Sequence, residues 1–551
     1  MKPPTALLRK KWDAIVVGGG HNGLVAASYL AKAGKSFSRA SYVFSLFRPQ
    51  IIKDLDLHRH GLEVFVRDPS SFTPTRDGRS LILGSDMQQT QASIAQFSTA
   101  DAKAYPVYNK MLEVLLKLRL MVIGRFTECC LVAQDMVDFF LPMLDEAPPD
   151  LHTAFDSASS LSRRLEAAKA MAHLGYRCGK LGSELTTFVE FMTAPATKIL
   201  DKWFESDVLK ATLATDAIIG AKVSPSTPGS AYILFHHVMG EVNGIKGAWG
   251  HVKGGMGGVS EAIAKAATEA GAEIHVSSPV KSISVQDGKA RGVCLESGDV
   301  VESDCILSNA SPATTMLDLL DPRDLPEDVV THFKRNWNSE SAITKINVAL
   351  DRLPNFSCFP NGGDGNVPMP NHYGTIHFED SLGQIEDAYL DAQRGICSKR
   401  PVIEMNIPTS LDPTIAPPGK HIALLFVQYT PYEPKDGKWS EPGKKERFAS
   451  QVFSVIDEYA PGFTNSIIDY EMLTPPDLER VFSLPRGNIF HGAMGLDQLF
   501  WMRPMPGNSS YRSPIDGLYF CSAGTHPGGG VMGACGRNAA MVCLKYQKFH
   551  K

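Results

Sequence analysis

Three glycines near the start of the chain have the spacing of a pyrophosphate cradle. Gly18, Gly20 and Gly23 form a G-x-G-x-x-G motif, preceded by an apolar run at residues 14–17 and followed by good helix formers up to Gly34. In such a unit the first glycine permits the strand-to-helix turn, the second lets backbone approach the phosphates, and the third lets the helix lie close to the strand. The N–H groups at the start of the helix then face the phosphates. The motif predicts a dinucleotide site, with an ordinary glycine-rich turn as the alternative.

The residue that should complete this site is missing from its expected place. A second strand ending in Asp or Glu, about 20 residues after the glycines begin, normally binds the adenosine ribose. Between Gly34 and Asp54 the chain contains no carboxylate. The sequence therefore predicts half a site, in which the phosphate cradle is present and the ribose clamp is absent.

The end of the chain contains a second glycine-rich turn between a strand and a helix. Residues 517–523 are strand-like, residues 524–533 form the turn, and residues 534–546 have a helical pattern. The start of this helix offers a second set of backbone donors. Between the two ends, a glycine-opened helix at residues 254–270 precedes strand-like runs at 273–276, 280–285, 290–295 and 300–301, with turns that suit an antiparallel meander.

Elements of one nucleotide-binding domain at opposite ends of the chain predict a discontinuous α/β architecture. We expect the Rossmann-like domain to comprise residues 11–44, 246–313 and 512–551, after a basic N-terminal tail at residues 1–10. The partner domain, residues 45–245 and 314–511, is inserted twice. Its first part is mostly helical from about residue 85 to residue 215, and its second part has strand-like runs at 344–350, 401–407 and 421–428 and a helix at 444–459. We expect a mixed sheet with a helical cap.

Composition excludes several function classes. The 551 residues are 43% hydrophobic and 21% charged with a net charge of −4, which indicates a folded protein and no nucleic-acid partner. The ten cysteines include no C-x-x-C pair, so we expect neither a metal site nor a disulfide framework. No run is long and apolar enough for a transmembrane segment. Residues 111–126 predict an amphipathic helix that faces the core, with peripheral membrane contact as the alternative.

The first residues bear on the cellular location. Residues 1–11 contain Lys2, Arg9, Lys10 and Lys11 and no acidic residue. This pattern is compatible with a short mitochondrial targeting sequence and equally with a solvated basic tail. We expect a mitochondrial matrix protein with a mitochondrial protein partner, and the cytoplasm is the alternative.

Three stretches of the chain together resemble one known group of proteins. Residues 15–27, 254–258 and 524–534 are similar to the carotenoid desaturase and isomerase group of flavoproteins, which shares the glutathione-reductase-like FAD fold with the amine oxidases. The resemblance implies non-covalent FAD and an oxidoreductase that takes hydride from an apolar small-molecule substrate, or that isomerises a double bond with the help of reduced flavin. The chain has no C-x-x-x-x-C pair, so flavin–disulfide chemistry is not expected.

The resemblance also implies which residues contact the cofactor. Gly18, Gly20 and Gly23 would face the pyrophosphate, and the backbone near Val280 would face the adenine. The ribityl and flavin end would lie along the terminal turn, at Gly524, Gly529, Gly530, Val531 and Met532. The side chains considered for a role near flavin or substrate are His491, Arg503 and His526, with structural hydrogen bonding as the alternative for the first two. No catalytic residue is assigned.

The chain departs from the group at one place. In the group, the second strand with its acidic end and a Gly-Gly segment precede the stretch that here occupies residues 37–41. Loss of that segment, by alternative splicing or a faulty gene model, is the simplest account. The alternative is that residues 37–46 replace the strand, with Arg39 or Ser41 where the acid belongs. FAD binding by this chain is therefore in doubt, and a non-catalytic binding protein, like the Rab GDP-dissociation inhibitors on this fold, is the second functional hypothesis.

Overall fold

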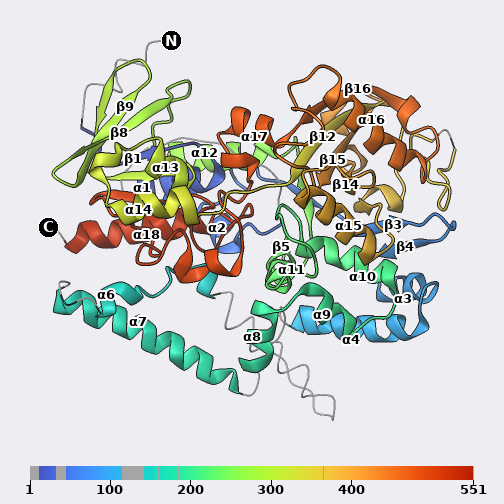
Figure 1. Ribbon diagram of the computed structural model, residues 1–551, viewed down its shortest axis with the longest axis horizontal. Helices are drawn as coiled ribbons and strands as arrows, with labels where there is room; N and C mark the ends of the chain where they lie inside the picture. Colours follow the sequence, from blue (N-terminus) through green and yellow to red (C-terminus); the bar gives the residue numbers. More distant parts are fainter. Residues whose placement is uncertain are drawn as a thin grey trace.

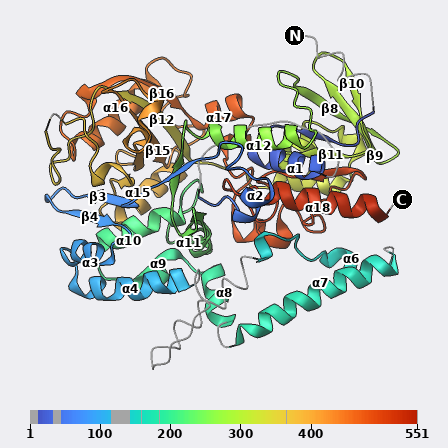
Figure 2. The same ribbon diagram turned by 180° about the vertical axis from the view of Figure 1, so that it is seen from behind.

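The computed structural model describes residues 11–32, 45–114, 142–155, 157, 160–182, 185–363 and 365–549. Two sheet-containing regions lie side by side, and a long helix, α7 (Leu161–Lys180), runs beneath the region that contains α1, α12 and α18 (Figure 1). The view from behind shows the same arrangement, with α1, α12 and α18 gathered in one region and α16 in the other (Figure 2).

Strands from three distant parts of the sequence form the sheet of the first region. β1 (Ile15–Val17), β11 (Ile306–Ser308) and β17 (Leu518–Phe520) are parallel and lie in the order β1-β11-β17. β11 and β17 are fully buried, as expected of parallel strands covered on both faces. Among the described strands, β1 pairs only with β11.

Three helices cover this sheet. α1 (His21–Lys32) packs against both α12 (Gly257–Glu269) and α18 (Ala534–Phe549). The first and last helices touch through their backbones, because a Cβ added at Gly536 would lie 1.9 Å from the carbonyl oxygen of Asn22. The two ends of the chain therefore build one unit.

The predicted antiparallel meander is present as β8 (Val280–Gln286), β9 (Lys289–Leu295) and β10 (Val300–Glu302). The predicted strand at residues 273–276 is wrong, because these residues pair with no described strand. They lie beside the start of β1, since the rings of Trp12 and His275 are 6.1 Å apart. Val276, an apolar residue of this segment, is 68% exposed. Among the described residues, no strand covers it.

The second region contains a mixed sheet of seven strands. All neighbours are antiparallel except the parallel pair β13–β3. In spatial order the strands are β16 (Ile467–Leu473), β12 (Ile343–Leu350), β15 (His421–Gln428), β14 (Val402–Asn406), β13 (Thr375–His377), β3 (Ser71–Pro74) and β4 (Ser80–Leu83). One apolar face of this sheet packs against α16 (Lys444–Asp457).

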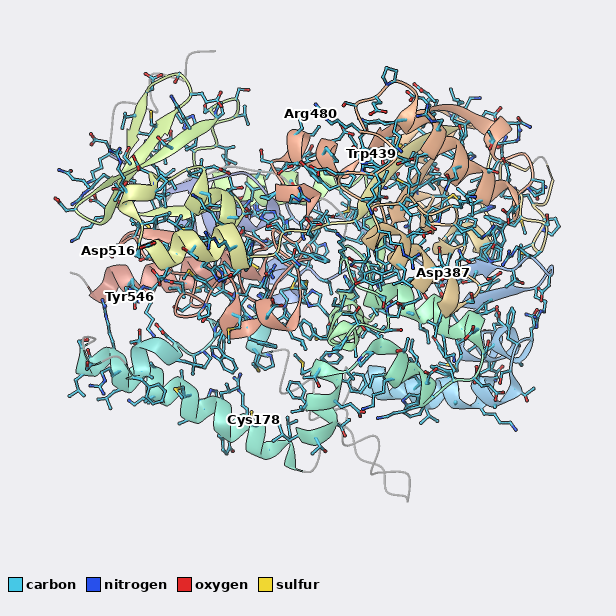
Figure 3. All side chains as sticks on the ribbon, viewed as in Figure 1. Cys178, Asp387, Trp439, Arg480, Asp516 and Tyr546 are labelled. Carbon is cyan, nitrogen blue, oxygen red and sulfur yellow. The ribbon has the colours of Figure 1, made fainter. Side chains whose placement is uncertain are left out.

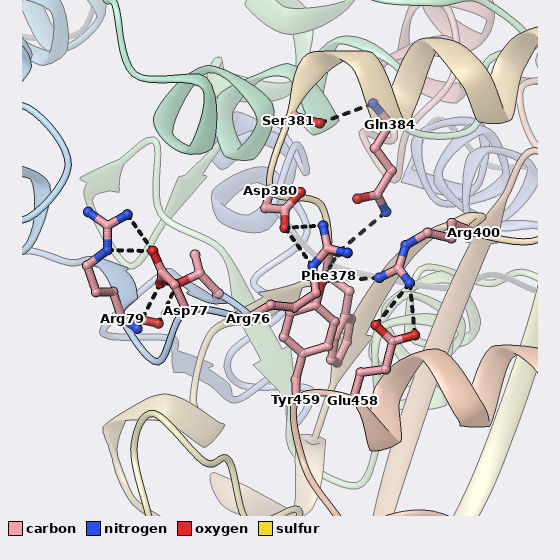
Figure 4. A network of polar contacts seen from close by, with 11 residues as sticks. Arg76, Asp77, Arg79, Phe378, Asp380, Ser381, Gln384, Arg400, Glu458 and Tyr459 are labelled. Carbon is pink, nitrogen blue, oxygen red and sulfur yellow. Dashed lines mark hydrogen bonds and ion pairs between the residues drawn. The ribbon is translucent and has the colours of Figure 1, made fainter.

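Ion pairs and a hydrogen bond connect the end of α16 to residues next to β13 and β14 (Figure 4). Arg400 forms two bonds of 2.8 and 2.9 Å with the carboxylate of Glu458, and Tyr459 donates to the carbonyl of Phe378 at 3.3 Å. Arg76, in the β3–β4 turn, binds Asp380 at 2.7 Å. This network holds the end of α16 and the β3–β4 turn against the residues that follow β13.

Helices form a cap over the second region, as predicted. Its apolar core is built from α3 (Met87–Ala95), α4 (Thr99–Val114), α9 (Ala196–Asp201), α10 (Asp207–Ala214) and α11 (Ser230–Val238). The remaining segments include α2 (Pro49–Asp54), β2 (Val64–Val66), α6 (Leu151–Phe155), α8 (Leu185–Thr193), β5 (Glu241–Val242), β6 (Ile245–Lys246), β7 (Gly250–Val252), α13 (Pro312–Leu317), α14 (Glu327–Thr331), α15 (Leu382–Gln393) and α17 (Pro475–Phe482).

Helix α7 carries Cys178 at its far end, while its first turns lie near Tyr546 of α18 (Figure 3). The Arg163 guanidinium lies 5.2 Å from the centre of the Tyr546 ring. No helix in the described ranges is long and apolar enough to cross a bilayer. The amphipathic helix predicted at residues 111–126 falls outside the described residues beyond Val114.

Candidate functional site

The N-terminal glycine loop has the geometry of a phosphate cradle. Gly18 has φ +89°, a left-handed conformation that favours glycine. A Cβ at Gly23 would lie 2.4 Å from the carbonyl oxygen of Gly18, so only glycine allows this close approach. The carbonyl of Gly20 accepts the first helical hydrogen bond, from the N–H of Leu24 at 3.0 Å. The N–H groups at the start of α1 are thus directed out of the loop.

The terminal glycine turn is packed too tightly for any other residue. A Cβ at Gly529 would lie 1.8 Å from the ring of Phe490, and a Cβ at Gly524 would lie 2.2 Å from Pro312. Gly530 has φ +114° and approaches Leu46. These contacts fix the path of the backbone before α18.

The loop and the turn contact each other directly. The His21 ring forms a hydrogen bond with the backbone of Gly530. His21, Gly530, Val531 and His491 are only half-buried, although their chain neighbours are mostly buried. The two glycine motifs therefore lie side by side, as a cofactor that spans both would require.

Arg503 lies under the terminal turn and is fully buried. Its guanidinium donates only to backbone carbonyls, and burial lowers its pKa to about 10, so it stays protonated at neutral pH. The accepting carbonyls belong to Phe490, Gly492, Ala493, Gln498, Ala523 and Thr525. Arg503 therefore joins residues 490–498 to the start of the turn, and every bond that the structure gives it is made to the backbone.

His526 is also bound on both sides. Its Nε2 lies 2.7 Å from the carbonyl oxygen of Met143, and its own carbonyl accepts from the Tyr511 hydroxyl at 2.6 Å. Burial lowers the pKa of His526 to about 4, so the ring is neutral at neutral pH. His526 therefore connects the turn to the cap. Neither of these bonds joins His526 to the N-terminal glycine loop.

His491 differs from the other two side chains considered from the sequence. Burial lowers the pKa of His491 to about 3, and the nearby His21 and Arg503 lower it further. Its Nδ1 is buried and has no hydrogen-bond partner among the described residues. A neutral ring with an unpaired nitrogen beside the glycine turn is able to bind a ligand.

The sequence predicts no site role for His236, because a histidine pair without further ligands nearby is typical of packed or partly exposed side chains. Its Nε2 lies 2.8 Å from the carbonyl oxygen of Gly529, so α11 supports the glycine turn directly. Burial and the charge of His237 lower the pKa of His236 to about 3. Among the described residues, no group of three or more His, Cys, Asp or Glu side chains could hold a metal ion.

Two further predicted cofactor contacts, Val280 and Met532, lie in separate apolar clusters. Val280 begins β8 and packs in the apolar cluster that contains Val17 of β1. Met532 is buried, and its carbonyl accepts from the N–H of Arg48 at 3.0 Å. No bound group tests these assignments, so they stay predictions.

The described residues supply no carboxylate at the place where the ribose clamp is expected. Asp54, the first carboxylate after Gly34, lies at the end of α2 and accepts from the Tyr29 hydroxyl at 2.5 Å. Tyr29 is in the third turn of α1, far from the glycine loop at its start. Among the described residues, no strand lies between β1 and residues 273–276. Most of the alternative strand predicted at residues 37–46 lies outside the described residues. The residues present fit the pyrophosphate and the flavin end of FAD, and they do not supply a ribose carboxylate.

Residues 133–544 match the flavin containing amine oxidoreductase family. The chain belongs to this family. It is 46% identical to the Rattus norvegicus protein named pyridine nucleotide-disulfide oxidoreductase domain-containing protein 2, over 98% of this chain and 94% of the rat protein. It is 26% identical to the Daucus carota chloroplastic prolycopene isomerase, over 95% of this chain and 78% of the isomerase. A putrescine oxidase triple mutant has the same fold, with a TM-score of 0.53 and 14% identity over 98% and 99% of the two chains.

These comparisons confirm the α/β FAD fold, the resemblance to carotenoid desaturases and isomerases, and the class of FAD-dependent oxidoreductases with non-covalent cofactor. They also bear on the missing strand. The alignment with the rat protein runs over 572 positions and this chain has 551 residues, so at least 21 residues of the relative have no counterpart here.

Proposed function

We propose that this protein is an FAD-dependent enzyme that removes hydride from a C–H bond of a largely apolar substrate, or that isomerises a double bond in it. The observation that carries the proposal is the direct contact between the glycine loop before α1 and the glycine turn before α18, where the His21 ring bonds to the backbone of Gly530. The name of the carrot relative specifies isomerisation of a carotenoid, which is an apolar substrate.

The protein's own groups would position and polarise the reacting partners. FAD, when bound, supplies the hydride acceptor. The positive end of α18 stabilises negative charge that develops beside the turn. Arg503 and His236 hold the carbonyls of the turn in place, which fixes the path of its backbone. His491 offers an unpaired nitrogen and no charge, so it can accept a hydrogen bond there.

A binding protein without catalysis is the second candidate, and the empty ribose end favours it. No carboxylate lies between Gly34 and Asp54, and Asp54 is bound to Tyr29. A lost charge-assisted hydrogen bond costs about 1.5–3 kcal/mol, and 1.4 kcal/mol corresponds to a factor of ten in affinity. FAD binding weakened by about one to two orders of magnitude would leave much of the protein without cofactor.

Flavin content decides between the two candidates. The chain is purified after expression with added riboflavin, and its flavin absorbance and its melting temperature with added FAD are measured. We expect less than one flavin per chain and a measurable rise in melting temperature. A variant with the rat relative's counterpart segment inserted after Gly34 is expected to bind FAD at least tenfold more tightly, because the clamp is restored.

Each other outcome has a clear meaning. Colourless protein without any FAD shift, in both the chain and the insertion variant, would reject the oxidoreductase for this chain and leave the binding protein. Full flavin occupancy of the unmodified chain would show that the ribose clamp is dispensable.

We further propose that the protein acts in the mitochondrial matrix with a mitochondrial protein partner, with the cytoplasm as the alternative. The basic residues Lys2, Arg9, Lys10 and Lys11 support this location. A fluorescent fusion of the full chain should co-sediment with mitochondria and resist protease there. Replacement of these four residues by glutamine should redistribute it to the cytosol, and an unchanged distribution would contradict the proposal.

A further inference from the structure

A small cavity lies between α7 and the chain that leads into β17. Arg163 of α7 and residues 512–519 line it, and its volume is about 230 Å³. Tyr546 and Asp516 mark this place at one edge of the molecule, above the first turns of α7 (Figure 3). Sites for drug-sized ligands usually measure about 300–1,000 Å³, so this cavity suits a small ligand or one group of a larger one.

The cavity lies at the opposite end of the sheet β1-β11-β17 from the glycine motifs. The three strands are parallel, and the glycine loop and the glycine turn follow the carboxyl ends of β1 and β17. Residues 512–517 instead precede the amino end of β17. The cavity is therefore separate from the candidate cofactor site, and an inference about it does not depend on the proposed function.

Two guanidinium groups meet at this cavity, beside the ring of Tyr546. The guanidinium carbon of Arg512 lies 4.1 Å from the centre of that ring, and the guanidinium carbon of Arg163 lies 5.2 Å from it. Arg512 also donates from Nη1 to the Tyr546 hydroxyl. Among the described residues, neither arginine has an ion pair with a carboxylate. Two guanidinium groups that share one ring without an acidic partner suit a common anion.

The carboxylates around the cavity have cations of their own. Asp516 is the acidic residue in the cavity wall, and its carboxylate lies 3.9 Å from the ammonium group of Lys289. Asp304, whose backbone lies against the same wall, forms ion pairs with Lys11 and, at 2.9 Å, with Arg291. Neither carboxylate therefore offsets the charge of the two arginines in the cavity.

The charges on α7 next to the cavity also favour an anion. Glu166, one turn after Arg163, forms an ion pair with Lys545 of α18. Arg164 adds a further positive charge, and its Nε is buried without a partner among the described residues. The first turns of α7 therefore bring a surplus of positive charge to this place.

Helix α7 is attached to the rest of the molecule by few buried contacts. Of its twenty residues, only Ala167 is buried. Burial of apolar side chains is the main source of packing energy, so this helix gains little of it. A ligand that contacts Arg163 and Arg512 together would therefore strengthen a weak connection between α7 and the chain before β17.

We propose that Arg163 and Arg512 together bind the phosphate group of a small phosphate monoester, and that the bound ligand fixes α7 against residues 512–519. A phosphate monoester carries nearly two negative charges at neutral pH and three oxygens that accept from both guanidinium groups. A carboxylate carries one charge and would leave one arginine unpaired. The monoester is either a free small molecule or the headgroup of a phosphatidic acid, and the two sources are separated by experiment.

Calorimetric titration of the purified full chain at about 0.15 M salt, where distant charges are screened, tests the site. Glycerol 3-phosphate should bind at least tenfold more tightly than glycerate, a polyol of similar size with a carboxylate. Arg163→Gln and Arg512→Gln should each weaken binding at least tenfold, because each removes charge-assisted hydrogen bonds. Lys180→Gln is the matched control, since it removes one positive charge from the exposed far end of the same helix, and it should bind like the unmodified chain.

Hydrogen exchange measures whether the ligand fixes α7. Glycerol 3-phosphate should slow exchange of the amides at residues 161–180 at least threefold, and Arg512→Gln, which leaves α7 itself unchanged, should abolish this slowing. Exchange in α7 that ignores the bound ligand would overturn the bridging role. Equal affinity for glycerate, no binding of either probe, or unchanged affinity in both arginine variants would overturn the phosphate site.

Vesicles of phosphatidylcholine that contain phosphatidic acid distinguish the two sources of the phosphate group. If the unmodified chain sediments with these vesicles, and Arg163→Gln and Arg512→Gln do not, the ligand is a lipid headgroup. If glycerol 3-phosphate binds and no chain sediments with the vesicles, the ligand is a free monoester. Sedimentation that is equal for the unmodified chain and both arginine variants would show that lipid binds elsewhere and would contradict a headgroup in this cavity.

Discussion

Replacement of Arg503 by methionine is expected to lower the free energy of unfolding by about 4 kcal/mol or more, or to abolish soluble protein. Methionine fills a similar volume but donates no hydrogen bonds, so the backbone carbonyls that Arg503 satisfies would be left buried and unpaired. Each unsatisfied buried acceptor costs about 1–3 kcal/mol, and water entering the gap would offset only part of the sum. Urea unfolding followed by circular dichroism measures the change.

Two further variants separate this effect from a general loss of charge. Arg503→Lys keeps three donors and should recover part of the stability. Arg394→Met removes a guanidinium whose side chain is 64% exposed, and it should change stability by less than about 0.5 kcal/mol. If Arg503→Met were as stable as the unmodified chain, the hydrogen bonds to the turn would contribute nothing.

The second large effect is expected at the crossing of the first and last helices. Gly536→Ala places a methyl group 1.9 Å from the carbonyl oxygen of Asn22 and 3.0 Å from the backbone nitrogen of Ala26. Both atoms belong to the backbone of α1, so no side chain can move aside and the helices must separate. Overpacking of this kind costs about 3 kcal/mol or more, and it shifts the glycine loop relative to the glycine turn. Melting temperature and FAD titration report the two effects.

Gly175→Ala is the matched control for this change. Gly175 also lies in a helix, and a Cβ there meets nothing within 4 Å. Alanine has the higher helix propensity, so this variant should gain up to about 1 kcal/mol. A loss of stability in Gly175→Ala equal to that in Gly536→Ala would show that the crossing has no special role.

Strand and helix positions were largely predictable, because they depend on local pattern. Alternating or continuous apolar runs predicted β15 at residues 421–428 and β12 within one residue of its start. The order of strands was not predictable. β16 lies beside β12, and β13 pairs in parallel with β3 about 300 residues earlier, and no local pattern specifies such long-range partners.

The candidate site was predictable where backbone geometry demands one residue type. At residues 18, 23 and 529, only glycine suits the backbone conformation or leaves room for the neighbouring atoms, so the residue type itself marks these positions in the sequence. Arg503 and His526 were predicted as candidates near flavin or substrate, and the structure shows their bonds to backbone carbonyls. Carbonyl groups are present at every residue, so the sequence alone cannot indicate which of them an arginine will bind. The strand predicted at residues 273–276 is wrong because these residues pair with no described strand, and pairing partners are not visible in a local pattern.

The sheet β1-β11-β17 has a consequence for how the protein is made. Its strands come from residues 15–17, 306–308 and 518–520, so the first strand is synthesised about 500 residues before the last. At about 5–20 residues per second, β1 and the glycine loop wait on the order of a minute for their partners. During that time an apolar strand and the inner face of α1 have no native surface to cover them. Apolar surface that is left uncovered for this time is a surface that chaperones can bind, and the glycine turn can join the glycine loop only after it has left the ribosome.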